Sequence, residues 1–594
     1  MKSRRIPIFG SSFLPAFAVA AGLLGAGSAR AQSSAIVSRL PARTVAFVEW
    51  RGAKAVAGEE GQNHVLQLLG DPSLAPLWLE MAADFQKQEQ SHAAASPLSL
   101  PDILSLVQNP AAAGIIEVPQ ATESSGHADA STGGKPAPPV ATFVVYDATG
   151  KTDILKKWDT AAAANGPNAP VVTHFRFAGV SIEERASKTS TTYSAMAGHY
   201  FVASNKKPVI EDFITRFSGN DAPTESLAKR PEYVEVRKFI GNDGAFDYFA
   251  RMPNLKRWIA ASAKGKNPAA LKFIDGLRLE KIQAMGGSVS FAGEATRIRG
   301  AVLGNTLPIG PFDFAGTSGT SFQTMSIAGA SPEFNVSRLN FAALYRLVMG
   351  AATTVVPEQQ AANLQSAQTM AQAYLGMTIP DALNLFTGEL ASASSFSDDG
   401  SEERTYAATI QKPDAVLHIL RTILGGMTLA EEFFGDATML DIAYPYRDSA
   451  TGLKRRKMYY VAVTPQLLLV APRKALLRET LESLSARAGA TVSPAKGVFF
   501  DPEYAKMRAL LPARLSGLAV EDMAQIPWNA VWTNFENRLQ QPTSQNPRPS
   551  NTRHSPDPSW MRLIKPDVIP RHLHMAVSGW WKDTDGVYFD SYIQ

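Results

Sequence analysis

Alternating hydrophobic and polar positions run through two long segments, residues 287–303 (GSVSFAGEATRIRGAVL) and 575–593 (MAVSGWWKDTDGVYFDSYI). Successive side chains of a strand point to opposite faces of a sheet, so this period of two predicts strands with one buried face. Glycines near the middle of each segment predict turns. Each segment is therefore predicted to form a β-hairpin.

Shorter patterns predict further strands and the helices between them. Strands are predicted at residues 44–50, 142–147, 334–341 and 405–410. Helices are predicted to begin near Pro101, Asp153, Lys206, Pro231, Pro380, Asp414, Arg473 and Pro502. Proline suits a first helical turn because its missing N–H would have no partner there. Helices interspersed with hairpins favour an α+β fold with mainly antiparallel sheet.

The predicted elements occur twice in the same order. The clearest match is PEYVEVR at 231–237 with PEYAKMR at 502–508. Further matches are collinear: Asp102 with Asp381 (offset 279), Asp153 with Asp414 (offset 261) and Glu232 with Glu503 (offset 271). Such order is the signature of an internal repeat. We therefore predict two duplicated α+β units, each a mainly antiparallel sheet with packed helices.

The repeat defines the predicted domains. The first unit spans 36–304 and carries a Pro/Gly/Ser-rich insert at 119–139. A connection at 305–330 leads to the second unit at 331–594, which carries a polar, Pro-rich insert at 540–559. Both inserts have the composition of exposed loops.

The Pro-Glu-Tyr segments are interpreted as equivalent helix starts rather than as a ligand motif. Asp501 is a candidate N-cap in the second copy, and Glu232 lies where the helix dipole favours negative charge. Tyr233 and Val236 share one helical face, and Arg237 falls four residues after the tyrosine. Packing and capping thus account for the repeated positions.

The N-terminus is typical of a secretory signal peptide. Residues 1–31 contain a basic start, an apolar run and the small-x-small sequence Ala29-Arg30-Ala31. Cleavage is predicted after Ala31, and the expected location is periplasmic or secreted. The general secretory and twin-arginine routes both stay open.

Composition narrows the function classes. The chain has 58 basic and 54 acidic residues, and residues 1–31 hold four of the basic ones, so residues 32–594 have 54 of each. This balance gives no support to a nucleic-acid partner. The chain has no cysteine, which excludes thiol catalysis, cysteine metal sites and a lipid anchor on cysteine. No transmembrane span is expected in the mature chain.

Several features together resemble a known family. They are the signal peptide, the segments LPARTVAFVEWRGAKAV (40–56) and LLGDPSLAPLW (68–78), a hairpin leading into ASNKKPVIEDFI, and the Pro-Glu-Tyr helix. This combination resembles the DUF3352 family of bacterial envelope proteins of unknown function, particularly its long acidobacterial members. The resemblance covers most of the mature chain and implies export and architecture, with no catalytic residue to carry over. The inserts at 119–139 and 540–559 depart from the family pattern.

Four short motifs suggest chemistry, and each has a structural alternative. His572 and His574 would share a strand face and could hold a metal. Ser493 and Lys496 fit the serine-lysine spacing, but Pro494 opposes the helical turn that such a pair needs. Asp583–Gly586 has the start of a calcium loop and the composition of a hairpin turn. The basic run 454–457 could bind an anionic polymer or protect an exposed strand edge.

The sequence assigns no catalytic, cofactor-binding or metal-binding residue. Tryptophans 528, 532, 560, 580 and 581 are expected mainly in the core, with one of the adjacent pair 580 and 581 exposed. The leading hypothesis is a non-catalytic binding or envelope-associated protein without a cofactor, whose partner is an unknown envelope ligand or protein. The alternatives are an envelope hydrolase or an assembly partner that uses sheet edges. A cleft lined by carboxylates in one unit only would favour the hydrolase.

Overall fold

The structure, a computed structural model, describes residues 35–53, 56, 61–81, 83, 100–118, 140–163, 171–187, 190–219, 225–263, 272, 275–291, 293–304, 312–356, 358–397, 399–447, 453–489, 498–540, 563 and 565–594. The predicted signal peptide 1–31 and the insert 119–139 lie outside these residues. So do the pair Ser493 and Lys496 and all of the insert 540–559 except Gln540.

Two compact units make up the described chain. Unit 1 holds the described residues of Met1–Lys264, Ile282–Gly304 and Asp557–Ile564, and unit 2 those of Gly265–Lys281, Asn305–Pro556 and Lys565–Gln594. Each unit combines helices with antiparallel sheet, so the predicted α+β class is confirmed. Lys272 and residues 275–281 were predicted in the first unit but group with unit 2, where Thr354 Oγ1 donates to the Lys272 carbonyl (3.0 Å).

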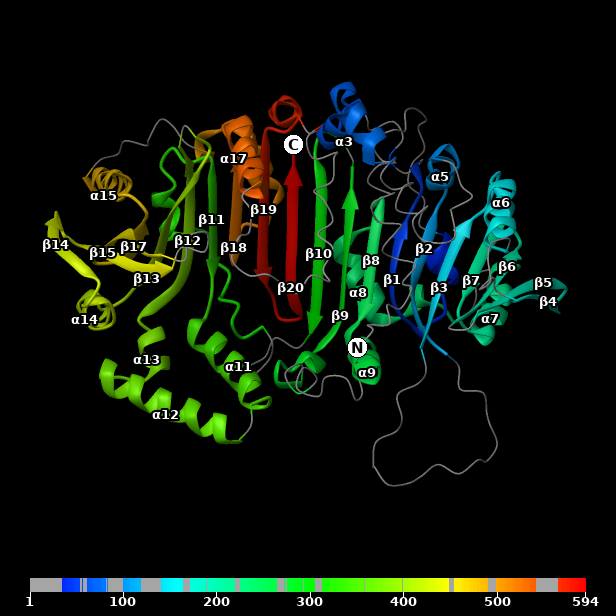
Figure 1. Cartoon of the computed structure of the whole chain (residues 1–594), viewed down its shortest axis with the longest axis horizontal. Helices are drawn as coiled ribbons and strands as arrows, with labels where there is room; N and C mark the ends of the chain where they lie inside the picture. The colour runs from blue at the N-terminus through cyan, green and yellow to red at the C-terminus, as the bar shows by residue number, and fades with distance from the viewer. Residues whose placement is uncertain are drawn as a thin grey trace. The chain divides into compact units, whose positions relative to one another are not determined.

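The described strands of unit 1 form one antiparallel sheet (Figure 1). They are β1 (Thr44–Trp50), β2 (Ala111–Glu117), β3 (Val140–Asp147), β4 (Val171–Phe177), β5 (Val180–Ala186), β6 (Thr191–Ala197), β7 (Tyr200–Ser204), β8 (Phe246–Arg251), β9 (Ile282–Ser290) and β10 (Thr296–Gly304). Their order across the sheet is β10–β9–β8–β1–β2–β3–β7–β6–β5–β4.

Helices of unit 1 bury aromatic side chains against this sheet. The helices are α2 (Ala35–Arg39), α3 (His64–Leu69), α5 (Leu100–Val107), α6 (Thr152–Ala163), α7 (Lys207–Phe217), α8 (Pro231–Ile240) and α9 (Met252–Ala263). Phe213 of α7 meets Phe143 edge to face, with ring centroids 5.3 Å apart. Tyr233 of α8 packs in the same way on Phe249, at 5.1 Å. These contacts form much of the core, because each buried aromatic ring contributes about 1.5–3 kcal/mol.

The described strands of unit 2 also form one antiparallel sheet. They are β11 (Glu333–Arg338), β12 (Phe386–Phe396), β13 (Glu402–Ile410), β14 (Thr428–Phe434), β15 (Ala437–Arg447), β16 (Lys454–Val463), β17 (Leu467–Ala471), β18 (Gly517–Asp522), β19 (Met575–Lys582) and β20 (Gly586–Ile593). Their order is β20–β19–β18–β11–β12–β13–β17–β16–β15–β14. Strand for strand along the chain, this is the order observed in unit 1.

Unit 2 also contains helices, and two of them lie beside its outer strands (Figure 1). The helices are α11 (Phe341–Thr353), α12 (Glu358–Leu375), α13 (Ile379–Leu383), α14 (Pro413–Leu424), α15 (Lys474–Gly489), α16 (Pro502–Leu510), α17 (Trp528–Gln540) and α18 (Ile569–His572). Figure 1 shows α14 and α15 beside the yellow strands, and Val416 of α14 packs with Leu440 and Ile442 of β15. No helix among the described residues is long and apolar enough to cross a membrane.

The predicted helix starts are confirmed at both Pro-Glu-Tyr segments. Pro231 and Pro502 begin α8 and α16, and the Asp501 side chain accepts from the Glu503 N–H (2.7 Å). Tyr233 is buried and the Arg237 guanidinium lies 6.0 Å from its ring centroid. One boundary was wrong: the strand predicted at 334–341 ends at Arg338. The chain then enters α11, because the Asn340 side chain caps that helix by accepting from the Ala343 N–H (2.9 Å).

The predicted connection 305–330 has a defined place in unit 2 over its described part, 312–330. Ala315 forms an isolated bridge with Leu339, and Gly319 forms one with Leu515. The short helix η5 (Gln323–Ile327) then packs on β12 and β13. This segment is thus a packed part of unit 2 as well as a connection.

A shared register point allows the two sheets to be compared position by position. The N–H of Arg51, directly after β1, donates to the Ala245 carbonyl before β8 (3.0 Å). The N–H of Arg338, the last residue of β11, donates to the Ser516 carbonyl before β18 (2.6 Å). Arg51 and Arg338 therefore occupy corresponding positions, and their neighbours can be paired by counting from them.

Candidate functional site

A row of polar side chains crosses four neighbouring strands of unit 2. Glu333 of β11 lies directly opposite Glu521 of β18 on one side and Ser394 of β12 on the other. Ser394 in turn lies opposite Arg404 of β13. Residues directly opposite one another in a sheet share a face, so these four side chains stand side by side. Glu402 joins them from the same face of β13, two residues before Arg404.

This row borders a pocket of about 270 Å³ in unit 2. The pocket is lined by Glu333, Phe396, Gly400, Glu402, Arg404, Ile526, Trp528, Val531, Asn534 and Phe535. The sheet supplies the charged groups, and α17 with the segment before it supplies most of the apolar ones. Its volume lies just below the usual range for ligand pockets, about 300–1,000 Å³, so it suits only a small molecule.

The turn between β12 and β13 holds α17 at one end of the pocket. Gly400 has φ +74°, and a Cβ there would lie 2.2 Å from the backbone carbonyl carbon of Ala530 in α17. Only glycine combines this conformation with so close an approach. The Asn534 amide donates to the Ser401 hydroxyl (3.2 Å), which joins helix and turn a second time. The lining residues of α17 are therefore positioned by the turn.

The carboxylates of the pocket differ in environment. Burial raises the pKa of Glu333, a hydrogen bond from Ser394 lowers it in part, and the charges of Glu402 and Glu521 raise it further. Burial also raises the pKa of Glu521. Glu402 forms an ion pair with the Arg404 Nε and accepts from the Ser394 hydroxyl (2.8 Å). Arg404 Nη2 lies 3.9 Å from Glu333 Oε2, so one guanidinium serves two carboxylates.

The corresponding positions in unit 1 carry no charge. Five residues before Arg51 stands Ala46, opposite Ala250 and Ile115, with Thr142 opposite Ile115 on the next strand. In unit 1 helix α9, which follows β8, packs on β1, β8 and β9. The charged row is therefore a feature of unit 2, whereas in unit 1 the counterpart of Phe396 is Glu117, which accepts from Asn254 of α9 (2.6 Å) and pairs with Arg257 of α9 (3.2 Å).

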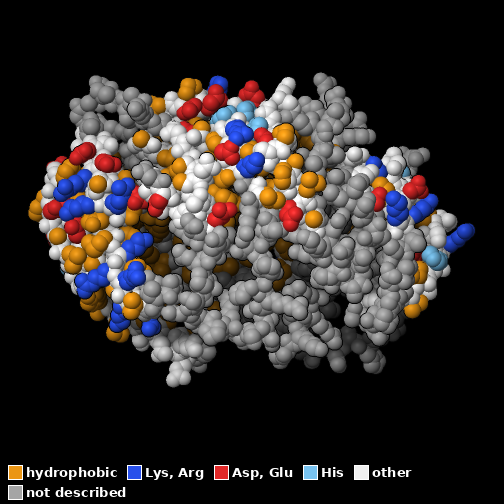
Figure 2. All heavy atoms as spheres, turned by 45° about the horizontal axis from the view of Figure 1, so that its top comes forward, with side chains coloured by type: hydrophobic (Ala, Val, Ile, Leu, Met, Phe, Trp, Pro, Cys, Tyr) orange, Lys and Arg blue, Asp and Glu red, His pale blue; other side chains and the backbone are white. Residues whose placement is uncertain are grey.

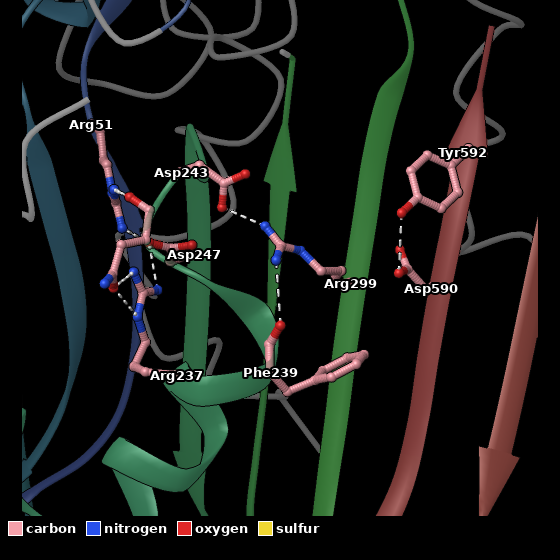
Figure 3. A network of polar contacts seen from close by, with 9 residues as sticks. Arg51, Arg237, Phe239, Asp243, Asp247, Arg299, Asp590 and Tyr592 are labelled. Carbon is pink, nitrogen blue, oxygen red and sulfur yellow. Dashed lines mark hydrogen bonds and ion pairs between the residues drawn. The ribbon is translucent and has the colours of Figure 1, made fainter. Parts of the chain in front are cut away.

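Unit 1 instead contains a buried charge network behind β1 and β8 (Figure 3). Asp247, with 2% of its surface exposed, forms ion pairs with Arg51 and with Arg237 Nη1 (2.9 Å). Arg237 also donates from Nε and Nη2 to the Asn242 side-chain oxygen (3.1 and 2.8 Å). Glu49 adds a second carboxylate, 3.9 Å from Arg51 Nε. Two acids thus balance two arginines.

Geometry favours a structural role for this network. The Arg51 side chain has 5% of its surface exposed and Glu49 has 1%, so a ligand has no access to their ion pair. Arg299 forms a neighbouring ion pair with Asp243 and donates to the Phe239 carbonyl (3.3 Å) at the end of α8. These contacts anchor the C-terminal end of α8 to the sheet.

Unit 2 places different residues at the matching positions. Val336 and Leu518, both 3% exposed, stand directly opposite one another where unit 1 has Glu49 and Asp247. Arg338 is retained but pairs with Glu389 of β12, through Nε (3.2 Å) and Nη2 (2.9 Å). The same arginine position is therefore neutralised from a different strand in each unit.

The structure separates the sequence-predicted histidine pair. His572 is the last residue of α18 and His574 precedes β19, so the prediction that both lie on one strand face was wrong. Pro570 in the first turn of α18 favours the helix there. Among the described residues, no group of three or more His, Cys, Asp or Glu side chains could hold a metal ion.

The other sequence motifs have structural roles or positions in unit 2. Asp583–Gly586 is the turn between β19 and β20, where the Asp583 N–H donates to the Gly586 carbonyl (2.9 Å). Trp580 and Trp581 are both half-buried, so the expectation of one exposed ring was wrong. Trp581 stacks on Tyr588 and Trp580 donates to the Ser337 hydroxyl (3.4 Å). The basic run 454–457 lies on β16 and is exposed on both faces.

Comparison with models of protein families, with curated proteins and with solved structures found no match. The site therefore has to be interpreted from its own residues. Sequence reasoning missed Glu333, Glu402, Arg404 and Glu521, because they are brought together only by strand register across 188 residues (521 minus 333). The alternation of Glu402 and Arg404 on one strand face was the only local signal.

Proposed function

We propose that this protein is a binding protein whose unit 2 pocket takes a small organic cation. The observation that carries the proposal is the combination of carboxylates and aromatic side chains around one cavity of about 270 Å³. Glu333, Glu402 and nearby Glu521 outnumber Arg404, so the site has net negative charge when the acids are ionised. Phe396, Trp528 and Phe535 supply rings, whose faces attract cations.

The electrostatics of Glu333 also favour a cation. Its pKa is raised because burial disfavours its charge and Glu402 and Glu521 add to this effect, while the Ser394 hydroxyl and Arg404 offset only part of it. A bound cation would supply the counter-charge that Arg404, already paired with Glu402, provides only at 3.9 Å. The ionised form of Glu333 would then be stabilised by the ligand.

The test is calorimetric titration of residues 32–594 with choline and with its neutral carbon isostere, 3,3-dimethyl-1-butanol. We expect choline to bind at least about tenfold more tightly, because only the cation gains from the carboxylates and rings. Glu333→Gln keeps the shape of the side chain and removes its charge. We expect this variant to weaken choline binding by about tenfold, the value of one charge-assisted contact.

Glu431→Gln is the matched control, since Glu431 is an exposed carboxylate on β14 outside the pocket lining. Choline affinity should be the same in this variant and in the unmodified protein. Equal affinity for choline and the isostere, or no change in Glu333→Gln, would refute the proposed ligand class.

A hydrolase is the second candidate, and one observation favours it. The pocket holds two acids in unlike settings, Glu402 paired with Arg404 and Glu333 with a raised pKa, and this is how acid and base roles are divided between carboxylates. The described positions of unit 1 that correspond to Glu333, Glu521 and Arg404 carry uncharged residues, Ala46, Ala250 and Thr142. Turnover of nitrophenyl glycosides that is lost in both Glu333→Gln and Glu402→Gln would favour this candidate. Choline binding without turnover would favour the first.

We further propose that the protein is exported to the periplasm or beyond, and that its two units arose by duplication. The composition of residues 1–31 and the predicted cleavage after Ala31 support export. Collinear sequence matches and the corresponding strand orders support duplication. Membership of a DUF3352-like envelope family is proposed on the sequence features given above. N-terminal sequencing of the protein recovered from its native host tests the cleavage site.

A further inference from the structure

Strands β15 and β16 extend past their neighbours as a two-stranded arm, defined here as residues 444–447 and 454–459. Pairing of β15 with β14 stops at Ile442, and pairing of β16 with β17 begins at Tyr460. The two strands continue to pair with each other as far as Arg447 and Lys454. The arm therefore projects past β14 and β17, and at its base the half-buried Tyr459 packs against the core cluster that contains Val416 and Leu440.

One face of the arm interleaves aromatic and basic side chains. Tyr444 lies directly opposite Lys457, and Tyr446 lies opposite Arg455. Tyr459 follows on the same face, and the Lys457 ammonium sits 5.2 Å from its ring centroid. Tyr444 and Tyr446 are 51% and 39% exposed. This face, the tyrosine face, consists of residues 444, 446, 455, 457 and 459.

The other face of the arm is basic without exposed tyrosines. Arg447 lies opposite Lys454 and Pro445 lies opposite Arg456, and all four are exposed. In Figure 2, basic side chains lie among hydrophobic and acidic ones at the end of unit 2 where Figure 1 shows β14 and β15. The described arm residues thus include five basic side chains and no acidic one. Such a concentration attracts polyanions.

We propose that the arm binds an acidic polysaccharide along its tyrosine face. Tyrosine rings can stack on the apolar C–H faces of sugars, while Arg455 and Lys457 pair with the carboxylates between them. Tyr444 and Tyr446 are two residues apart, about 6.6–6.8 Å along the strand, so they can contact successive parts of one extended chain.

Two other polyanions fit the arm less well. A membrane surface would require one continuous apolar face, but both faces of the arm carry charge. Nucleic-acid binding generally comes with a wide basic surface, whereas residues 32–594 have as many acidic as basic residues. The positive charge is local to the arm, which suits a polymer with spaced charges.

The test compares two double variants with the same loss of charge. Arg455→Gln with Lys457→Gln changes the tyrosine face, and Lys454→Gln with Arg456→Gln changes the other face. In affinity electrophoresis through gels containing polygalacturonate, we expect the first pair to weaken binding by about tenfold and the second by less than about threefold. Tyr444→Ala with Tyr446→Ala should also weaken binding although it removes no charge.

Several outcomes would overturn the proposal. Equal weakening by the two charge variants would mean that net charge alone acts. If gels containing neutral dextran retard the protein as much as gels containing polygalacturonate, the basic residues have no role in binding. Tighter binding to single-stranded DNA or to phosphatidylglycerol vesicles than to polygalacturonate would assign the arm to another partner. Near-ultraviolet circular dichroism of each variant checks that the fold is retained, and choline binding should be unchanged because the arm is separate from the pocket.

Discussion

Replacement of Asp247 by alanine is expected to lower the free energy of unfolding of unit 1 by about 3–5 kcal/mol. Asp247 is 2% exposed and forms ion pairs with both Arg51 and Arg237. Its removal leaves two guanidinium groups buried beside a single remaining carboxylate, Glu49. Urea unfolding followed by circular dichroism measures the change, read as a shift in the first transition if the units unfold separately.

The second unit suggests how this loss can be repaired. Val336 and Leu518 fill the positions that correspond to Glu49 and Asp247, and both are buried. We therefore expect Asp247→Leu, combined with Glu49→Val, Arg51→Met and Arg237→Met, to recover much of the lost stability. Glu235→Ala, on the exposed side of α8, is the control and should change stability by less than about 1 kcal/mol. If Asp247→Ala proves as mild as this control, the network does not anchor α8.

Replacement of Glu389 by alanine is expected to cost a similar amount in unit 2, about 3–5 kcal/mol. Glu389 is 6% exposed and accepts from Arg338 and from the N–H (3.1 Å) and hydroxyl (3.3 Å) of Thr324. The change leaves the half-buried Arg338 without its acid and removes an acceptor from η5. We also expect residues 312–330 to become sensitive to protease, because they lose their main polar contact with β12.

Limited proteolysis followed by mass spectrometry locates the new cleavage sites. Glu389→Gln should show a smaller effect, since its amide oxygen can still accept from Thr324. Glu431→Ala removes an exposed pair with Arg421 and serves as the control, with an expected cost below about 1 kcal/mol. Cleavage of Glu389→Ala at the same rate as the unmodified protein would show that packing alone retains the segment.

Much of the fold followed from local patterns. The strands at 44–50, 142–147 and 405–410 were predicted because runs of β-branched and aromatic residues favour the extended chain. Strand β2 was missed because Ala111–Glu117 is rich in alanine and glycine, which carry little strand preference. Its buried place comes from β1 and β3 on either side, and this is a tertiary effect.

The candidate site could not be predicted from local sequence patterns. Glu333 and Glu521 face each other only because β11 and β18 pair in one register. A shift of one residue would turn Glu333 to the opposite face of the sheet. The ion pairs also depend on the tertiary structure. Arg51 and Arg338 occupy corresponding positions, yet Arg51 pairs with an acid on β8 and Arg338 with one on β12. The sequence contained these residues but not the register that joins them.

Proton release on ligand binding tests the cation pocket most directly. Burial raises the pKa of Glu333 and Glu521, so both acids keep their protons to a higher pH than ordinary carboxyl groups do. A bound cation favours their ionised forms and displaces the protons. Affinity should then rise with pH and level off once both acids are ionised in the free protein.

Calorimetry of choline binding from about pH 5 to about pH 8, in two buffers with different ionisation enthalpies, measures both quantities. The proposed cation pocket implies proton release at the acidic end, affinity that increases with pH, and a smaller release in Glu333→Gln. Choline binding with no proton release and a constant affinity across this range would contradict it.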